Sequence, residues 1–334
     1  MKEKSKPPRK APAWLTDPRL DRPLRILVVC LSLFLAGLIL STTINNYVNY
    51  SASHALPEEM TATVVAEEPE PFRLRIETAE KTDPFPVTDP VYGWQRDGDK
   101  IIYVNQDGRC LTGLQRVDGR WHYFAPDGTK ARALGVDVSY YNEDVDWRAV
   151  HGQGIDFAIV RVGGRGWTYG LIYGDLRCKQ YLHNAREAGL QVGVYFYSTA
   201  GSEREAAAEA RAVLDVLDGQ ALDLPVFIDV EESGEYPNGR ADRLSREERT
   251  RNVLAFCRVI EAAGYETGIY SGQYYYNTNL YRESFGDRMI WLANYSASER
   301  GRVPGFGGRY DIWQFTDRGK VKGINGYTDM NVMF

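Results

Sequence analysis

Two carboxylates close the most apolar strand that the sequence predicts. The run Leu224-Pro-Val-Phe-Ile-Asp-Val-Glu231 ends in Asp229 and Glu231, two positions apart. Alternate side chains of a strand share one face, so the two acids point the same way, with Cα atoms roughly 6–7 Å apart. Burying acids at the end of a Val-Phe-Ile run costs free energy of folding, so their presence there indicates a function. The stretch therefore predicts a pair of acids that face one site.

The elements that must position this pair alternate along the chain from Gly135 onward. Ser202-Glu-Arg-Glu205 and Ser245-Arg-Glu-Glu248 are capping boxes, and they predict helices that run to about Leu217 and Ala263. Eight strands with at least four helices predict an α/β fold, a TIM-like β/α barrel with a reduced number of helices. A doubly wound sheet is the alternative, but no Gly-x-Gly-x-x-Gly follows the first strand. The expected strands are 136–139, 157–162, 191–197, 225–230, 267–271, 289–294, 310–315 and 329–334.

Closure of this barrel would gather four acids at one mouth. Asp137 closes the first strand, Asp229 and Glu231 end the fourth, and Asp329 begins the last. Like charges that lie so close raise at least one pKa, which leaves a protonated acid near neutral pH. Aromatic rings expected at the same level can stack on sugar faces, so the combination indicates glycoside hydrolysis. These rings are Tyr140, Tyr141, Tyr195, Tyr197, Tyr270, Tyr295 and Trp313.

Five motifs follow one another in this region. They are Asp137-Val-Ser-Tyr-Tyr-Asn142 with Val145-Asp-Trp147, Leu224-Pro-Val-Phe-Ile-Asp-Val-Glu231, Trp291-Leu-Ala-Asn-Tyr295, Trp313-Gln314 and Gly323-Ile-Asn-Gly-Tyr-Thr-Asp-Met-Asn331. Taken in order, they resemble the glycoside hydrolase family 25 muramidases, the Chalaropsis-type lysozymes. The resemblance covers about 135–334 and adds Trp291 to the expected substrate contacts. The family more often shows Val-Asp-Leu-Asn where this chain has Thr328-Asp-Met-Asn331, which is a conservative departure.

The resemblance implies a flattened barrel that cleaves the β-1,4 bond between N-acetylmuramic acid and N-acetylglucosamine in peptidoglycan. By position, Glu231 would be the general acid. Asp229 would be its partner, which orients the substrate N-acetyl group or stabilises positive charge, and Asp137 and Asp329 would complete the acidic cluster. A non-catalytic wall-binding or tethering protein is the alternative from another class, and a chitinase-like hydrolase is a second rival.

A short internal repeat precedes the barrel, at about 92–134. Tyr103 recurs as Tyr123 and Asp107-Gly108 as Asp127-Gly128, each 20 residues on, and Asp-Gly between aromatic segments predicts hairpins. The pattern resembles the glucan- and choline-binding repeats of Gram-positive surface proteins. That resemblance implies wall-binding aromatics, with a cell-wall glycan or teichoic acid as ligand. The expected aromatics are Trp94, Tyr103, Trp121 and Tyr123, and a structural collar packed on the next domain is the alternative.

The N-terminal third predicts a membrane anchor. A basic tail at 1–25 precedes an uncharged apolar run that predicts a transmembrane helix at 26–48, and a spacer rich in Pro and Glu follows at 49–91. The positive-inside rule keeps the tail in the cytoplasm, so the catalytic domain at 135–334 is expected outside the cell membrane. The alternative is a cleaved signal peptide, with Ser53-His54-Ala55 as its cleavage site.

Charge and cysteine content exclude several other functions. The formal net charge of −5 argues against a nucleic-acid partner. The chain has four His and no Cys-x₂-Cys or His-x₃-His spacing, so neither zinc nor any other metal or cofactor is expected. Three cysteines lie outside the apolar run, an odd number that indicates no disulfide framework.

Overall fold

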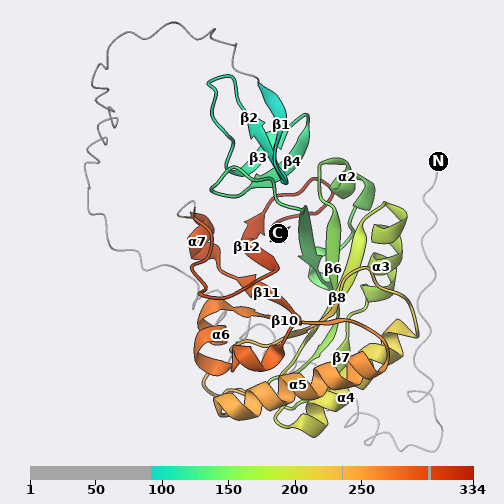
Figure 1. The fold of residues 1–334 in the computed structure, drawn as a ribbon. Helices are drawn as coiled ribbons and strands as arrows, with labels where there is room; N and C mark the ends of the chain where they lie inside the picture. Colours follow the sequence, from blue (N-terminus) through green and yellow to red (C-terminus); the bar gives the residue numbers. More distant parts are fainter. Residues whose placement is uncertain (1–91, 235, 300–301) are drawn as a thin grey trace, which may run out of the picture. The chain divides into compact units, whose positions relative to one another are not determined.

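The computed structural model describes residues 92–234, 236–299 and 302–334, all within one compact unit (Figure 1). The predicted tail, anchor and spacer at 1–91 lie outside the described residues. Among the helices that are described, none is both long and apolar enough to span a bilayer.

A closed eight-stranded barrel forms the centre of this unit, because the first strand, β5, pairs with both β6 and β13. Seven strands are parallel, and β13 runs antiparallel to both of its neighbours. A ninth strand, β7 (Ile172–Gly174), pairs antiparallel with β6 outside the ring and was not predicted. Around the barrel the order is β5 (Ala133–Val138), β13 (Thr328–Met333), β12 (Ile312–Gly319), β11 (Met289–Ala293), β10 (Thr267–Gly272), β9 (Val226–Asp229), β8 (Gln191–Tyr197) and β6 (Phe157–Arg165).

Helices connect most of the parallel strands on the outside of the barrel (Figure 1). Ser202 and Ser245 cap α4 and α5 as the sequence predicts, each accepting a hydrogen bond from the backbone N–H three residues on. No helix separates β12 from β13, which is why β13 can turn back antiparallel. The helices are α2 (Trp147–Gly152), α3 (Cys178–Glu187), α4 (Glu203–Leu217), α5 (Arg246–Ala262), α6 (Gln273–Asn279) and α7 (Tyr295–Glu299), with short 3₁₀ turns η2 (Tyr140–Asn142) and η3 (Arg282–Phe285).

Strand alternation divides the core into two clusters. Residues such as Phe157, Phe227 and Trp291 fill the inside of the barrel, while their chain neighbours pack against the helices outside. Paired residues on neighbouring strands point to the same side of the barrel wall. On β11 and β12, for example, Trp291 pairs with Ile312 and Ala293 with Gln314. For a residue on a barrel strand, a shift of one position in the register would therefore turn its side chain from the inside of the barrel to the outside.

Two β-hairpins precede the barrel at the repeat offset of 20 residues. They comprise β1 (Gly93–Asp97) with β2 (Lys100–Val104), and β3 (Gly113–Val117) with β4 (Arg120–Phe124). Their two-residue turns contain Gly98 and Gly119, both at positive φ. The Asp107-Gly108 and Asp127-Gly128 pairs, expected as the hairpin turns, instead follow the second strand of each hairpin.

The second hairpin packs on the barrel. Tyr123 is buried against Trp313, Phe315 and Phe334, with ring centroids 5.8, 5.8 and 6.3 Å away. The half-buried Trp121 donates its backbone N–H to the Gln153 carbonyl at 2.6 Å. The prediction of Tyr123 as a wall-binding ring is therefore wrong, because its faces are covered by the barrel.

The first hairpin keeps more of its aromatic surface open. Trp94 is 40% exposed, packs edge-on against Tyr103 and His122, and donates its indole N–H to Asp118 at 3.0 Å. The half-buried Tyr103 lies beside it. The predicted role of these two rings in wall binding stays a prediction.

We expect Tyr123→Ala to lower the free energy of unfolding by about 3 kcal/mol, because removing a buried aromatic ring leaves a cavity against the barrel. Urea unfolding followed by tryptophan fluorescence measures this change. Tyr92→Ala, at a residue that is 52% exposed, is the matched control and should change stability by less than about 0.5 kcal/mol. Equal small losses in both variants would show that the second hairpin does not buttress the barrel.

Candidate active site

Four acids meet on the inner face of the barrel at one end. Asp137 and Asp329 are cross-strand partners in the β5–β13 ladder. Asp229 is the last residue of β9, and Glu231, two positions later on the segment that follows, interacts electrostatically with it. Asp329 reaches this edge because the antiparallel β13 begins where the parallel strands end. The structure therefore brings together all four predicted acids, each of which interacts electrostatically with at least one other.

Asp137 is the most fully bonded of the four. Its Oδ2 accepts hydrogen bonds from Gln314 Nε2 and Asn331 Nδ2, both at 2.8 Å. Tyr270 and Tyr295 donate their hydroxyls to Gln314 Oε1 at 2.8 and 2.7 Å, and this leaves the amide nitrogen to face the carboxylate. The Trp291 indole donates to Asn331 Oδ1 at 2.7 Å and fixes the second amide in the same way.

Burial raises the pKa of every member of this cluster. It raises the pKa of Asp137 to about 6, against the opposing effect of the Asn331 and Gln314 hydrogen bonds. Burial followed by the charge of Asp137 raises the pKa of Asp329 to about 8. The pKa of Asp229 is held well above its usual range by burial, then by Glu231 and Asp137, against the opposing charge of Arg161. Near neutral pH the four groups therefore share protons as one unit.

Glu231 differs from the others in being open to solvent. The residue is exposed, whereas Asp137 and Asp229 are only 6% and 5% exposed. Enough protein surrounds its carboxyl group that burial, followed by the charge of Asp137, still raises its pKa to about 7. Because water reaches the side chain, solvent screens part of this effect. Asp329 also has a raised pKa but is half-buried, so Glu231 is the most exposed of the four acids and the one that a ligand reaches most directly.

Most of the predicted aromatic contacts face this mouth. Tyr195 and Tyr197 are half-buried on the inner face of β8, and Tyr140 is 40% exposed at the rim beside Tyr141. Tyr270 is buried, and with the half-buried Tyr295 it supports Gln314. Direct contact of these rings with a ligand stays a prediction.

Two predicted contacts are wrong. Trp313 is fully buried on the outer face of β12, where its indole donates to the Asn294 carbonyl at 3.0 Å. Trp291 is 1% exposed and lies beneath the acids, with its indole bonded to Asn331. Neither ring can therefore contact a ligand. The side chain of Trp313 points out of the barrel, and that of Trp291 lies deeper inside the barrel than the acids.

Sequence reasoning missed the polar residues that hold the acids. Gln314 and Asn331 both lie within the family-like motifs of the sequence. Asn331 is two residues after Asp329 on the same strand, so strand alternation alone predicts that its side chain also points into the barrel. Arg161 on β6 was also missed. Its guanidinium bonds Asp175 at 3.0 Å and lies 5.1 Å from the centre of the Tyr140 ring. It supplies the positive charge that opposes the rise in the Asp229 pKa.

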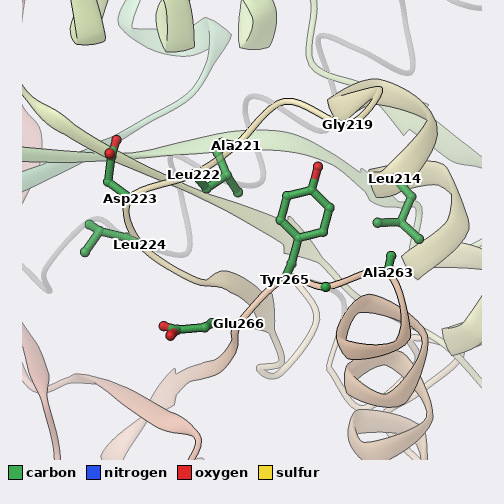
Figure 2. A pocket seen from close by; sticks show the side chains of 10 residues that line it. Leu214, Gly219, Ala221, Leu222, Asp223, Leu224, Ala263, Tyr265 and Glu266 are labelled. Atoms are coloured by element: carbon green, nitrogen blue, oxygen red, sulfur yellow. The ribbon is translucent and has the colours of Figure 1, made fainter.

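A cavity of about 610 Å³ lies elsewhere, at the amino-terminal edge of the barrel (Figure 2). Leu224 and Glu266, which precede β9 and β10, are among its lining residues, and Tyr265 and Leu222 lie near them. None of the four acids lines this cavity. Its two acids are Glu266 and Asp223, and Asp223 already pairs with Arg186 at 3.6 Å and accepts the Val192 N–H at 3.0 Å. The mouth that gathers four acids is therefore the candidate active site.

Comparison with known families places this site in context. Residues 136–324 match the family described as Glycosyl hydrolases family 25. The matched range includes Asp137, Asp229 and Glu231 and ends before Asp329. An uncharacterized protein, YegX of Escherichia coli strain K12, is 32% identical over 204 residues, which are 59% of this chain and 68% of that protein. An autolytic lysozyme of Clostridium acetobutylicum is 28% identical over 59% of this chain and 54% of its own length.

Solved structures share the fold. The modular autolysin LytC of Streptococcus pneumoniae superimposes with a TM-score of 0.56 at 20% identity, over 72% of this chain and 58% of that one. The spore cortex lytic enzyme SleM of Clostridium perfringens gives a TM-score of 0.53 at 23% identity, over 60% of this chain and 67% of that one. The chain thus spans little more than half of two of these relatives.

We expect Asp229→Asn to raise the melting temperature relative to the parent, and to do so more at pH 8 than at pH 4. The folded-state pKa of Asp229 is raised, so as pH climbs above about 4 the unfolded chain ionises freely while the folded chain must retain a proton or bury a charge. Its Oδ1 is buried with no hydrogen-bond partner among the described residues, which adds to that cost. Differential scanning calorimetry at the two pH values measures the shift. A gain that is equal at both would contradict the raised pKa.

Proposed function

This chain belongs to glycosyl hydrolases family 25 and is a glycoside hydrolase of the muramidase type, and on that premise we propose how its barrel mouth works. The proposed substrate is peptidoglycan, and the bond cut is the β-1,4 link between N-acetylmuramic acid and N-acetylglucosamine. The observation that carries the proposal is the contrast within the acid cluster. One carboxyl group is exposed with a pKa near 7, and buried carboxyl groups surround it.

The proposed chemistry begins with the Glu231 proton. Glu231 donates it to the glycosidic oxygen as the bond from that oxygen to the sugar breaks, so the leaving sugar departs neutral. Positive charge develops on the other sugar ring as this bond breaks, and water then adds to that ring and returns a proton to the Glu231 carboxylate. Asp229 lies two residues away and would orient the N-acetyl group through its protonated carboxyl group or, when ionised, stabilise that charge. Burial and the negative charge of Asp137 keep Glu231 protonated between turnovers.

We expect Glu231→Gln to lose about 10²–10⁴-fold in kcat, because the amide keeps the shape of the side chain but has no acidic proton to give. Release of reducing sugar ends from purified peptidoglycan measures the rate, and mass spectrometry of the products identifies which sugar is at the new end. The parent rate should also fall as pH rises through about 7, where Glu231 loses its proton.

Glu232→Gln is the matched control. Glu232 is the next residue and is also exposed. It should retain the parent activity. A folded Glu231→Gln protein with parent activity would remove Glu231 from the role of general acid. A parent protein that binds peptidoglycan without releasing new ends would favour the wall-binding alternative, and release of ends from chitin alone would favour the chitinase-like one.

The proposed location is the outer side of the cell membrane, with residues 26–48 as a single-pass anchor. The uncharged apolar run behind a basic tail supports it. We also propose that the first hairpin, through Trp94 and Tyr103, contacts a cell-wall glycan or teichoic acid, because those rings keep open surface. The second hairpin is assigned to packing on the barrel.

We expect protease added to intact protoplasts to remove the bulk of the chain and to leave a short membrane-embedded stub. An apolar run of this length is stable in the bilayer, and the tail ahead of it stays inside. Immunoblotting with an N-terminal tag reports the stub. A soluble form that begins near Leu56 would show that a signal peptide is cleaved instead.

A further inference from the structure

The proposed general acid sits where the barrel ladder does not hold it. β9 ends at Asp229, and Glu231 is the second residue of the segment 230–245, described at 230–234 and 236–245 and here called the acid loop, which leads to α5. On the barrel side, Val230 donates its N–H to the Tyr270 carbonyl at 3.1 Å and accepts from the Ser271 hydroxyl at 2.6 Å. The position of Glu231 therefore also depends on what holds the chain that follows it.

Asp242 holds that chain. Its Oδ1 accepts the Ser233 N–H at 3.1 Å, and its Oδ2 accepts the Gly239 N–H at 2.7 Å together with the Ser233 hydroxyl. One carboxylate thus joins the two limbs of the acid loop, two residues beyond Glu231. A side chain at Gly239 would place its Cβ 2.2 Å from Ser233 Oγ, so only glycine leaves room for this arrangement.

The base of the acid loop is fixed to two helices. Arg240 binds both carboxylate oxygens of Glu205 on α4, at 2.7 and 2.8 Å, and its backbone N–H donates to the Trp167 carbonyl at 2.9 Å. Glu205 was expected to close a capping box, and the structure shows its carboxylate accepting from Arg240 and the Gly201 N–H instead. Arg249 on α5 donates to the Asp242 carbonyl. Asp242 is thereby the link between a rigid base and the segment that bears Glu231.

We propose that Asp242 is a positioning residue for Glu231, which fixes the general acid in its place at the mouth through its three hydrogen bonds to Ser233 and Gly239. The inference rests on the proposed function of Glu231. Displacing a catalytic group by about 1 Å can cost roughly 10²-fold in rate. The Asp242 hydrogen bonds hold the chain at Ser233, only two residues beyond Glu231, so their loss can shift the Glu231 carboxyl group by such a distance.

The test is Asp242→Asn, which keeps the size of the side chain and removes one of its two acceptor oxygens. On a soluble tetrasaccharide of alternating N-acetylglucosamine and N-acetylmuramic acid, kcat should fall by about 10- to 100-fold while KM changes by less than about threefold. The alkaline limb of the kcat–pH profile should move to lower pH, because a displaced Glu231 carboxyl is better solvated and ionises more easily. A residue that serves stability alone would move neither quantity.

Asp223→Asn is the matched control. Asp223 also receives a backbone N–H, that of Val192 at 3.0 Å, but it lies at the opposite edge of the barrel. This variant should lower the melting temperature and leave kcat and the pH profile unchanged. Ser233→Ala removes the hydroxyl bond to Asp242 and keeps the backbone N–H bond, so its kcat should lie between those of the parent and Asp242→Asn, and it decides the question if Asp242→Asn does not fold.

Parent kcat and an unmoved alkaline limb in folded Asp242→Asn would overturn the inference. Where Asp242→Asn does not fold, a Ser233→Ala protein with parent behaviour would overturn it. Both results presuppose an active parent, so they leave the muramidase proposal intact. A parent that releases no reducing ends would instead refute the proposed function itself.

Discussion

The buried carboxylate of Asp137 is the group on which the organisation of the mouth depends. A carboxylate removed from water must be compensated by hydrogen bonds, and an unpaired charge at this depth would be strongly destabilising. Two amide groups provide the compensation, and each amide is oriented by its own donors. β5, β10, β11, β12 and β13 all contribute to this network, so it constrains the barrel as well as the site. Tyr270, Tyr295 and Trp291 act through it even where they present no free surface.

The desolvation that makes the Asp137 carboxylate unfavourable for folding also raises the pKa of Glu231, which suits Glu231 to act as a general acid. Negative charge held in a poorly solvated cluster resists further ionisation, and Glu231, the most exposed of the four acids, therefore retains a proton that it can transfer to a ligand. Asp229 has a buried oxygen without a hydrogen-bond partner among the described residues, which is unfavourable for folding. Such uncompensated polar groups are typical of sites where function is maintained at the expense of stability.

The four acids are not held in the same way. Asp137, Asp229 and Asp329 lie on strands, and the ladders fix their direction and spacing. Glu231 lies beyond its strand on a loop whose geometry comes from charged side chains, Asp242 within the loop and Glu205 on α4. Placing the exposed acid on a loop gives it access to substrate, and the charged contacts restore the rigidity that the ladder no longer supplies.

The sequence alone determined the barrel and the identity of its acids. Alternating apolar segments and helix caps gave all eight barrel strands to within a few residues, because these signals depend only on neighbours along the chain. The pairing of Asp137 with Asp329 followed from closure of the ring. The reversal of β13 and the added strand β7 did not follow, since both depend on contacts between distant segments.

Tertiary structure decided which neighbouring residues face the site. Trp313 and Gln314 are adjacent, yet the first packs outside the barrel and the second holds Asp137, because the β11–β12 register sets parity. Tyr123 and Trp94 stand in corresponding hairpins, yet only Tyr123 is covered by the barrel. Ser202 caps α4 as predicted, whereas Glu205, expected to complete the capping box, binds Arg240 instead. In each case the sequence identifies the residue and its chemistry. Which side chain it contacts depends on segments that are far apart in the sequence and meet only in the folded structure.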